Sequence, residues 1–382
     1  MSLQRGTQTL LKRTAVRQSC YQQRAMSNLA PFGVKYGPGG RSSNSGITAT
    51  VFGAYGSVGR YFIDELGKRG SRVYVPFRGC ELEVRHLKPM FDLGQLGLMP
   101  FSGRDRDSIL EAVQHSDVVI NLIGKHYETK HLVPTRRADG ELSRINYDFD
   151  EVHVTIPRTI AEVCKEAGVK SFIHMSALSA DLESKSKWSR TKALGELAVR
   201  EVLPDSIIVK PATIFGPNDR FLNMIAEGLQ KSPFFFPLIE EGATLVQPIY
   251  SIDVGRALMA IVDQHEQYAG KTFQLAGPAE YSYKEVAEFV SDISTLRKPL
   301  VDVPLPAAEL AGRAVEELVS PWFTQDSIRQ LTEDVLPQPK ETTGWLDMED
   351  LQLEATSMDK VAFEYLHRFR EGGHFTLAEG YH

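Results

Sequence analysis

The stretch that decides the fold is VFGAYGSVG, residues 51–59. It continues the apolar run 47–52 and leads into residues 58–68, whose apolar positions recur at helical spacing. Glycines at 53, 56 and 59 permit a sharp turn, a close approach of the backbone to a pyrophosphate and tight helix–strand packing. The amino end of the helix would offer N–H groups and a positive dipole to phosphates. This setting predicts a dinucleotide-binding turn; packing alone is the alternative reason for the glycines.

Strand and helix patterns alternate from residue 47 to about residue 275. Further strands are expected at 72–77, 98–101, 117–124, 170–175 and 205–210, with helices at 106–114, 148–167 and 186–202. Such alternation is typical of a doubly wound parallel sheet, so we expect an α/β, Rossmann-like fold. The long polar segment 124–147 is interpreted as a loop, either functional or disordered.

After residue 216 the alternation loosens. Helices are expected near 218–231, 251–264 and 282–293, and short strands near 244–249 and 272–275. These elements predict a smaller, mostly helical C-terminal lobe. The amphipathic segment 307–319 is expected to pack on the body, with a partner protein or a membrane surface as the alternatives.

Charge is distributed unevenly along the 382 residues. The first 46 contain seven Lys or Arg and no acidic residue, which leaves 36 basic and 49 acidic residues in the rest, a net charge of −13. An acidic body disfavours a nucleic-acid binder. No run of about 18 apolar residues is present, so no transmembrane segment is expected. The scattered cysteines at 20, 80 and 164 and the histidine spacing predict neither a metal site nor a disulfide framework.

The amino terminus has the composition of a mitochondrial presequence. Residues 1–27 are rich in Arg and hydroxyl side chains and lack acids. A disordered basic tail and a chloroplast signal are the alternatives. We therefore predict a presequence over 1–27, a flexible Gly/Ser-rich arm over 28–46, and an NADP(H)-binding domain over 47–216 whose sheet later strands complete. A C-terminal lobe and interaction tail would occupy 217–382.

The second predicted strand is followed by Arg78. Proteins that prefer NAD commonly carry Asp or Glu there, because a carboxylate accepts the ribose 2′-hydroxyl and repels a 2′-phosphate. The planar fork of an arginine can instead pair with that phosphate. Arg78 therefore predicts NADP(H); a surface arginine at a strand end is the alternative.

A reductase built on this fold needs a proton donor beside the nicotinamide, and none stands at the expected place. Lys192 lies near the start of the helix that follows residues 184–187, at the place of the reductase lysine. Four residues before it, where a reductase has a tyrosine, the chain has Trp188. An indole N–H does not transfer its proton near neutral pH, so it cannot replace a phenol. Ser176 follows the fifth strand, where a reductase carries its serine. Three tyrosines remain as candidates for a shifted base: Tyr127, Tyr147 and Tyr250.

These features together resemble the atypical and extended short-chain dehydrogenase/reductase superfamily. They are most similar to its accessory members in mitochondrial respiratory complex I, the alpha-subcomplex subunit 9 type. The resemblance is carried by residues 40–43, 50–60, 75–78, 85–88, 92–95, 117–124, 127–129, 208–216, 219–223, 247–250 and 253–254. It covers most of residues 40–280 and thins toward the carboxyl end.

The resemblance implies a tightly bound NADPH without turnover. It also implies a place on the matrix side of the inner membrane, among other complex I subunits where the matrix and membrane arms join, with a peripheral lipid contact. The expected contacts are the pyrophosphate with Gly53, Tyr55, Gly56, Ser57, Val58 and Gly59, the 2′-phosphate with Arg78, the adenine side with Leu122 and Ile123, and the nicotinamide half with Ser176, Lys192, Pro211 and Ile214.

The sequence departs from the family pattern at three places. Tyr55 replaces the usual Thr, which alters side-chain packing but not the backbone donors. Ser102 replaces the usual Asp beside the adenine, so that contact is not expected, and the 130–147 insertion is longer than usual. The leading hypothesis is a non-catalytic NADPH-binding accessory subunit. An NADPH-dependent reductase or epimerase with an atypical proton donor and an RNA-binding dehydrogenase relative are the alternatives, and the acidic body disfavours the latter.

Overall fold

The computed structural model describes residues 35, 37–128, 133–136, 142–232, 234–316 and 323–370. The predicted presequence lies outside these residues, as does the first part of the predicted arm. The described end of the arm is tied to the body, because the Gln95 side-chain amide donates to the carbonyls of Arg41 (2.8 Å) and Ser43 (2.9 Å). Within the described ranges, no helix combines the length and the apolar character needed to cross a bilayer.

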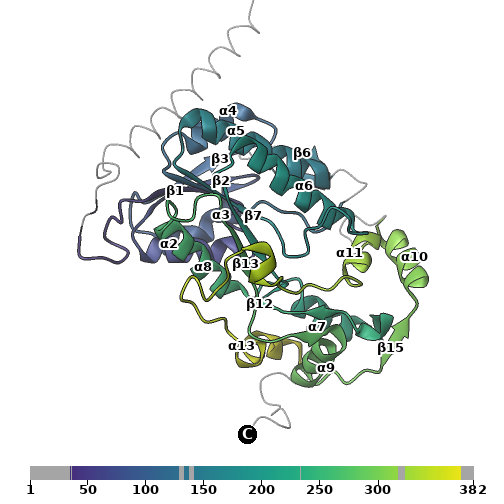
Figure 1. The fold of residues 1–382 in the computed structure, drawn as a ribbon. Helices are drawn as coiled ribbons and strands as arrows, with labels where there is room; N and C mark the ends of the chain where they lie inside the picture. The colour runs from purple at the N-terminus through teal and green to yellow at the C-terminus, as the bar shows by residue number, and fades with distance from the viewer. Residues whose placement is uncertain are drawn as a thin grey trace, which may run out of the picture.

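The centre of the molecule is a seven-stranded sheet in the order β13-β8-β7-β4-β1-β2-β3 (Figure 1). Every neighbouring pair is parallel. The predicted doubly wound, Rossmann-like fold is therefore confirmed. The strands are β1 (Thr48–Phe52), β2 (Arg72–Phe77), β3 (Leu96–Pro100), β4 (Val118–Asn121), β7 (Ser171–Met175), β8 (Ile207–Pro211) and β13 (Thr272–Leu275).

Helices cover both faces of this sheet (Figure 1). Successive strand residues point to opposite faces, so Val51 packs in one core with Phe62 and Ile261, and Phe52 packs in the other with Ile160. The first face carries α2 (Gly59–Lys68) and α8 (Ser251–Asp263). The second face carries α4 (Arg106–Val113), α5 (Ile156–Ala167) and α6 (Lys187–Val202). The β2–β3 connection contains α3 (Glu81–Val84) and η1 (Arg85–Met90).

The C-terminal lobe has its own core. α7 (Leu222–Lys231), α9 (Tyr283–Ser294) and α13 (Met358–Leu366) bury their apolar faces together. Three strand pairs border it: β9 (Ile214–Phe215) with β12 (Ile249–Tyr250), β10 (Phe236–Ile239) with β15 (Leu300–Val303), and β11 (Leu245–Val246) with β14 (Tyr281–Ser282). The remaining elements are η3 (Glu240–Gly242), α10 (Leu305–Val315), α11 (Gln325–Gln330), α12 (Lys340–Thr343) and η4 (His367–Phe369).

Later segments return to the sheet from this lobe. The edge strand β13 pairs with β8, and the backbone N–H of Gln274 donates to the Leu346 carbonyl at 2.8 Å. α8 packs directly on α2, since a Cβ at Gly255 would lie 3.1 Å from the Phe62 nitrogen. The division of the chain at residue 216 stays a prediction, because the chain crosses between sheet and lobe more than once.

Two interpretations of the sequence need correction. The segment 124–147 is not all loop, because β5 (Val133–Arg136) and β6 (Leu142–Ile145) pair as an antiparallel hairpin. Its strands contain Pro134 and two arginines, so the apolar alternation that marks a strand is missing. The helix expected over 148–167 is also not uniform: its start is the π-helical turn η2 (Glu151–Thr155), and α5 follows.

Candidate nucleotide-binding site

A cleft of about 390 Å³ opens at the carboxyl ends of β1 and β4. The chain leaves these neighbouring strands toward opposite faces of the sheet, which is where doubly wound folds bind their ligands. The predicted site residues on its wall are Gly53, Tyr55, Gly56, Arg78, Leu122 and Ile123. A groove of about 520 Å³ on the outer face of α6 is lined by Asp150, Glu201 and mostly apolar residues, so it is unsuited to phosphates.

The turn at the base of the cleft requires glycine. Gly53 has a φ of +77°, and a Cβ there would lie 2.8 Å from the carbonyl carbon and oxygen of Leu122. A Cβ on Gly59 would lie 2.5 Å from the Ala54 oxygen, so the amino end of α2 packs against the strand exit. In the described chain, α2 has neither a side-chain cap nor an acidic residue in its first turn. Its amino end therefore suits an anion.

Positive groups surround the cleft. Arg78, Lys125 and Arg220 are on its wall, and the Arg220 guanidinium lies 5.2 Å from the ring centre of Tyr127. The Lys125 ammonium donates to the Tyr147 carbonyl at 2.7 Å, and burial lowers the Lys125 pKa. These cations favour a ligand with several phosphate oxygens.

Trp188, on α6, is outside the set of residues that lines the cleft, but it bonds to the cleft wall. Its indole Nε1 donates to the Lys125 carbonyl oxygen at 2.7 Å. The buried Lys192 places its ammonium 5.7 Å from the indole ring centre and 3.4 Å from the Met175 carbonyl oxygen. Burial lowers the Lys192 pKa to about 8, opposed by the charge of Glu196. The Lys192 ammonium therefore contacts an indole ring and a carbonyl oxygen, and its expected role at the nicotinamide half stays a prediction.

Ser176 is engaged elsewhere. Its hydroxyl donates to the Glu196 carboxylate, which also pairs with Lys210 at 3.1 Å. The Lys210 ammonium in turn lies 4.6 Å from the ring centre of Trp345. The residues assigned to the nicotinamide half are outside the set that lines the cleft: Ser176, Lys192, Pro211 and Ile214. Their role stays a prediction.

The sequence interpretation missed several residues of this site. Lys125, His126 and Arg220 line the cleft, and Tyr147, expected only as a candidate base, does too. Position was the available signal for the first two, because residues that directly follow a strand at the switch point of a parallel sheet face the ligand. Arg220 and Tyr147 follow no such rule. Within the described ranges, no group of three or more His, Cys, Asp or Glu could hold a metal ion.

A buried histidine supports the cleft wall from behind. His153, in the π-helical turn, accepts from the Lys125 backbone N–H at 3.3 Å and contacts the Thr191 hydroxyl at 2.9 Å. Burial, with repulsion from Lys192 and His174, lowers its pKa to about 2. The ring is therefore neutral at ordinary pH. It fixes the wall against α6, where Trp188 packs edge-on against it at 6.0 Å.

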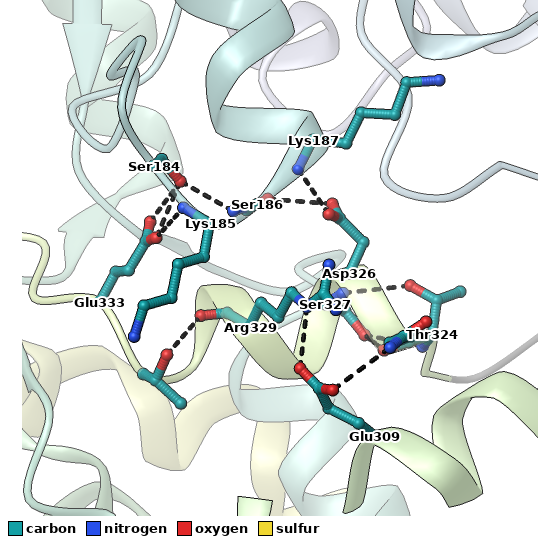
Figure 2. Close-up of polar contacts among 12 residues, drawn as sticks. Ser184, Lys185, Ser186, Lys187, Glu309, Thr324, Asp326, Ser327, Arg329 and Glu333 are labelled. Carbon is teal, nitrogen blue, oxygen red and sulfur yellow. Dashed lines mark hydrogen bonds and ion pairs between the residues drawn. The ribbon is translucent and has the colours of Figure 1, made fainter. Parts of the chain in front are cut away.

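The amino end of α6 is held by the C-terminal part of the chain (Figure 2). The Asp326 carboxylate of α11 accepts from the Ser186 hydroxyl (2.9 Å) and from the backbone N–H of Lys187 (2.6 Å). It also accepts from the backbone N–H of Trp188 (3.1 Å). Beside it, the Glu333 carboxylate accepts from the Ser184 hydroxyl at 2.7 and 2.8 Å. α11 therefore caps the helix that carries Trp188 and Lys192.

The comparisons with known proteins agree with this geometry. The family model described as NmrA-like family matches residues 46–311. The chain is 39% identical over 345 residues to "NADH dehydrogenase [ubiquinone] 1 alpha subcomplex subunit 9, mitochondrial" of Mus musculus, covering 88% of this chain and 84% of that protein. The chain belongs to the NmrA-like family, in its complex I alpha subcomplex subunit 9 group.

Members of this group occur in distant organisms. The protein of the same name from Arabidopsis thaliana is 38% identical over 364 residues, covering 92% of this chain and 86% of that protein. Among solved structures, the dTDP-glucose 4,6-dehydratase DesIV from Streptomyces venezuelae, with NAD and TYD bound, matches at a TM-score of 0.60 and 14% identity. That match covers 85% of this chain and 96% of DesIV. At this identity the likeness shows that this chain shares the fold of such enzymes and says nothing of a shared reaction.

Proposed function

We propose that this chain is an accessory subunit of mitochondrial respiratory complex I that holds NADPH as part of its own structure and does not oxidise it. The observation that carries the proposal is the Trp188 indole, bonded to the Lys125 carbonyl where a reductase needs a phenol. The complex I names of the relatives support the assembly. The proposed location is peripheral, on the matrix side of the inner membrane near the junction of the two arms, with other complex I subunits as partners and a peripheral lipid contact.

The described residues fit NADPH. The turn at Gly53 has no room for a Cβ, and the uncapped end of α2 gives backbone donors for the pyrophosphate. The exposed guanidinium of Arg78 suits the 2′-phosphate. When bound, NADPH carries a transferable hydride. The residues assigned to its nicotinamide half offer an amine and a hydroxyl already bound to a carboxylate.

A cofactor that undergoes no chemistry still stabilises the protein. A ligand that binds only the folded state adds about 4 kcal/mol at a thousandfold excess over its Kd. This is a large part of the net stability of a domain, which is about 5–15 kcal/mol. NADPH would thus serve the folding and assembly of the subunit.

The test is to release and identify the nucleotide of the purified native protein. We expect about one NADPH per chain, and co-migration of the protein with assembled complex I in a native gel. The Arg78→Glu variant should lose the nucleotide and accumulate less in mitochondria, because a carboxylate repels the 2′-phosphate. A native protein that carries no nucleotide, or one that carries NAD(H), would contradict the proposal.

One observation favours a second candidate, an NADPH-dependent reductase or epimerase with an atypical proton donor. Tyr127 and Tyr147 both line the cleft, so phenols are present near the ligand space. Tyr250, the third candidate, stacks on Phe215 in the lobe at 5.4 Å. NADPH consumption with a carbonyl compound, lost in the Lys192→Ala variant, would support this alternative.

A further inference from the structure

Tyr147, on the cleft wall, lies close to two arginines. The residue is buried, with 4% of its surface exposed. The Arg78 guanidinium carbon lies 5.0 Å from the ring centre, and that of Arg104 lies 4.6 Å from it. Both distances are within the range over which a guanidinium is attracted to an aromatic face. One buried ring therefore contacts both cations, Arg78 just after β2 and Arg104 beyond β3.

The two arginines differ in what else they bind. Arg104 donates to the Glu151 carboxylate from two nitrogens, Nε and Nη2, the latter at 2.8 Å. Its Nη2 also donates to the Asn146 carbonyl at 3.1 Å. Its fork is therefore occupied. Arg78 makes no hydrogen bond or ion pair with any other residue that the structure describes, and its side chain is exposed. The Arg78 fork is thus presented to the cleft on an aromatic support.

Two carboxylates of this region are engaged by other cations. Glu151 pairs with Arg104, and Glu128 pairs with Lys187 at 3.0 Å. Glu151, Glu128 and Arg78 all influence the pKa of Lys125 through their charges. These groups therefore share one region of the cleft. A carboxylate without its cation here would compete with an incoming phosphate for Arg78. With their own cations in place, Glu151 and Glu128 do not pair with Arg78, so the Arg78 charge stays open to a phosphate.

We propose that Tyr147 and Arg104 determine the preference of the cleft for a 2′-phosphorylated dinucleotide. The ring holds the Arg78 guanidinium in position, and Arg104 keeps Glu151 from pairing with it. Both are positioning residues, because each acts through Arg78. This inference rests on the proposed function. It adds two residues whose substitution should weaken the binding of NADPH and leave the binding of NADH unchanged.

The first test compares Tyr147→Leu with Tyr147→Phe, using NADPH and NADH as probes and nicotinamide fluorescence to measure Kd. Tyr147→Leu should weaken NADPH roughly threefold to tenfold, the range of a cation–aromatic contact, and change NADH by less than about twofold. Tyr147→Phe keeps the ring and should keep both affinities. Equal weakening of the two nucleotides, or a loss in Tyr147→Phe as large as in Tyr147→Leu, would overturn the role of the ring.

The second test is a double-mutant cycle at the ion pair. Arg104→Gln alone leaves Glu151 without its cation and should weaken NADPH about threefold or more. Arg104→Gln combined with Glu151→Gln should restore the wild-type ratio of NADPH to NADH affinity. A silent single variant, or a double variant no better than the single, would overturn the role of Arg104. If the wild-type protein binds neither nucleotide, the proposed function is contradicted together with this inference. If it binds NADPH but the variants leave the ratio of NADPH to NADH affinity unchanged, only this inference is contradicted.

Discussion

Trp188 and Lys125 are joined by a hydrogen bond of 2.7 Å from the indole Nε1 to the backbone carbonyl oxygen. The bond connects α6 with the cleft wall, because Lys125 lines the cleft. The only polar hydrogen of the indole is therefore used to hold the wall. Trp188, which the sequence predicts to stand where a reductase would carry its proton donor, therefore makes a structural contact with the cleft wall.

Trp188→Phe should destabilise the protein and loosen the nucleotide. The Lys125 carbonyl loses its donor, which costs about 1 kcal/mol for a partly buried group, and the smaller ring adds to the loss. Urea unfolding should show a lower midpoint at an unchanged slope, and NADPH should dissociate faster. A variant that unfolds at the wild-type urea concentration would show that the bond has no structural role.

Gly53→Ala should abolish nucleotide retention. An alanine there must adopt the left-handed backbone conformation of Gly53, which costs about 1–2 kcal/mol of stability. Its Cβ would also clash with the Leu122 carbonyl. Gly168→Ala is the matched control, because Gly168 has a φ of +69° with no atom within 4 Å of the added Cβ. The midpoint temperature of thermal unfolding and the nucleotide content should both fall further in Gly53→Ala than in Gly168→Ala. Equal losses in the two variants would mean that the clash at the turn is unimportant.

Asp326→Asn should loosen the first turn of α6. The substitution keeps the shape of the side chain and removes the negative charge at the helix amino end, a loss of about 1 kcal/mol. Hydrogen exchange at Lys187 and Trp188 should become faster. Glu309→Gln breaks the 2.8 Å pair with Arg329 on the other side of α11 and should leave this exchange unchanged (Figure 2). Identical exchange in both variants would contradict the capping role.

Lys192 predicts an unusual dependence of stability on pH. Its pKa falls from 10.5 to about 8 on folding, because burial disfavours the charged amine. Between these values the unfolded chain binds more protons, so the free energy of unfolding rises as the pH rises from about 8 to 10.5. Below pH 8 the buried charge costs about 3 kcal/mol.

The Lys192→Met variant tests this dependence in nucleotide-free protein, where no phosphate favours the charged amine. It should be more stable than wild type below pH 8, and the two proteins should converge as the pH approaches 10.5. A difference that stays constant over this range would show that the lysine does not titrate there.

The central sheet could be predicted from local patterns. Short apolar runs at 48–52 and 171–175 form β1 and β7 almost as expected, because a strand buried on both faces is nearly all apolar. The hairpin β5–β6 could not be predicted, since its polar residues form no alternating pattern. The π-helical turn before α5 leaves no mark in residue spacing that distinguishes it from an α-helical turn.

The residues of the candidate site could be predicted only where they directly adjoin a strand that the sequence itself predicts. The glycine turn and Arg78 adjoin predicted strands, so their positions follow from the fold. Asp326 lies far along the chain from the helix that it caps, and no local spacing connects them. Tyr147 likewise reaches Arg78 through the tertiary fold alone.

The most direct test of the account is the fate of the nucleotide in purified, NADPH-loaded protein. The protein is incubated with a panel of aldehydes and ketones while the reduced-nicotinamide absorbance is followed, and the nucleotide is then released and quantified. We expect about one NADPH per chain to be recovered, still reduced. Oxidation of the bound NADPH by any of these carbonyl compounds, abolished by Lys192→Ala, would contradict it.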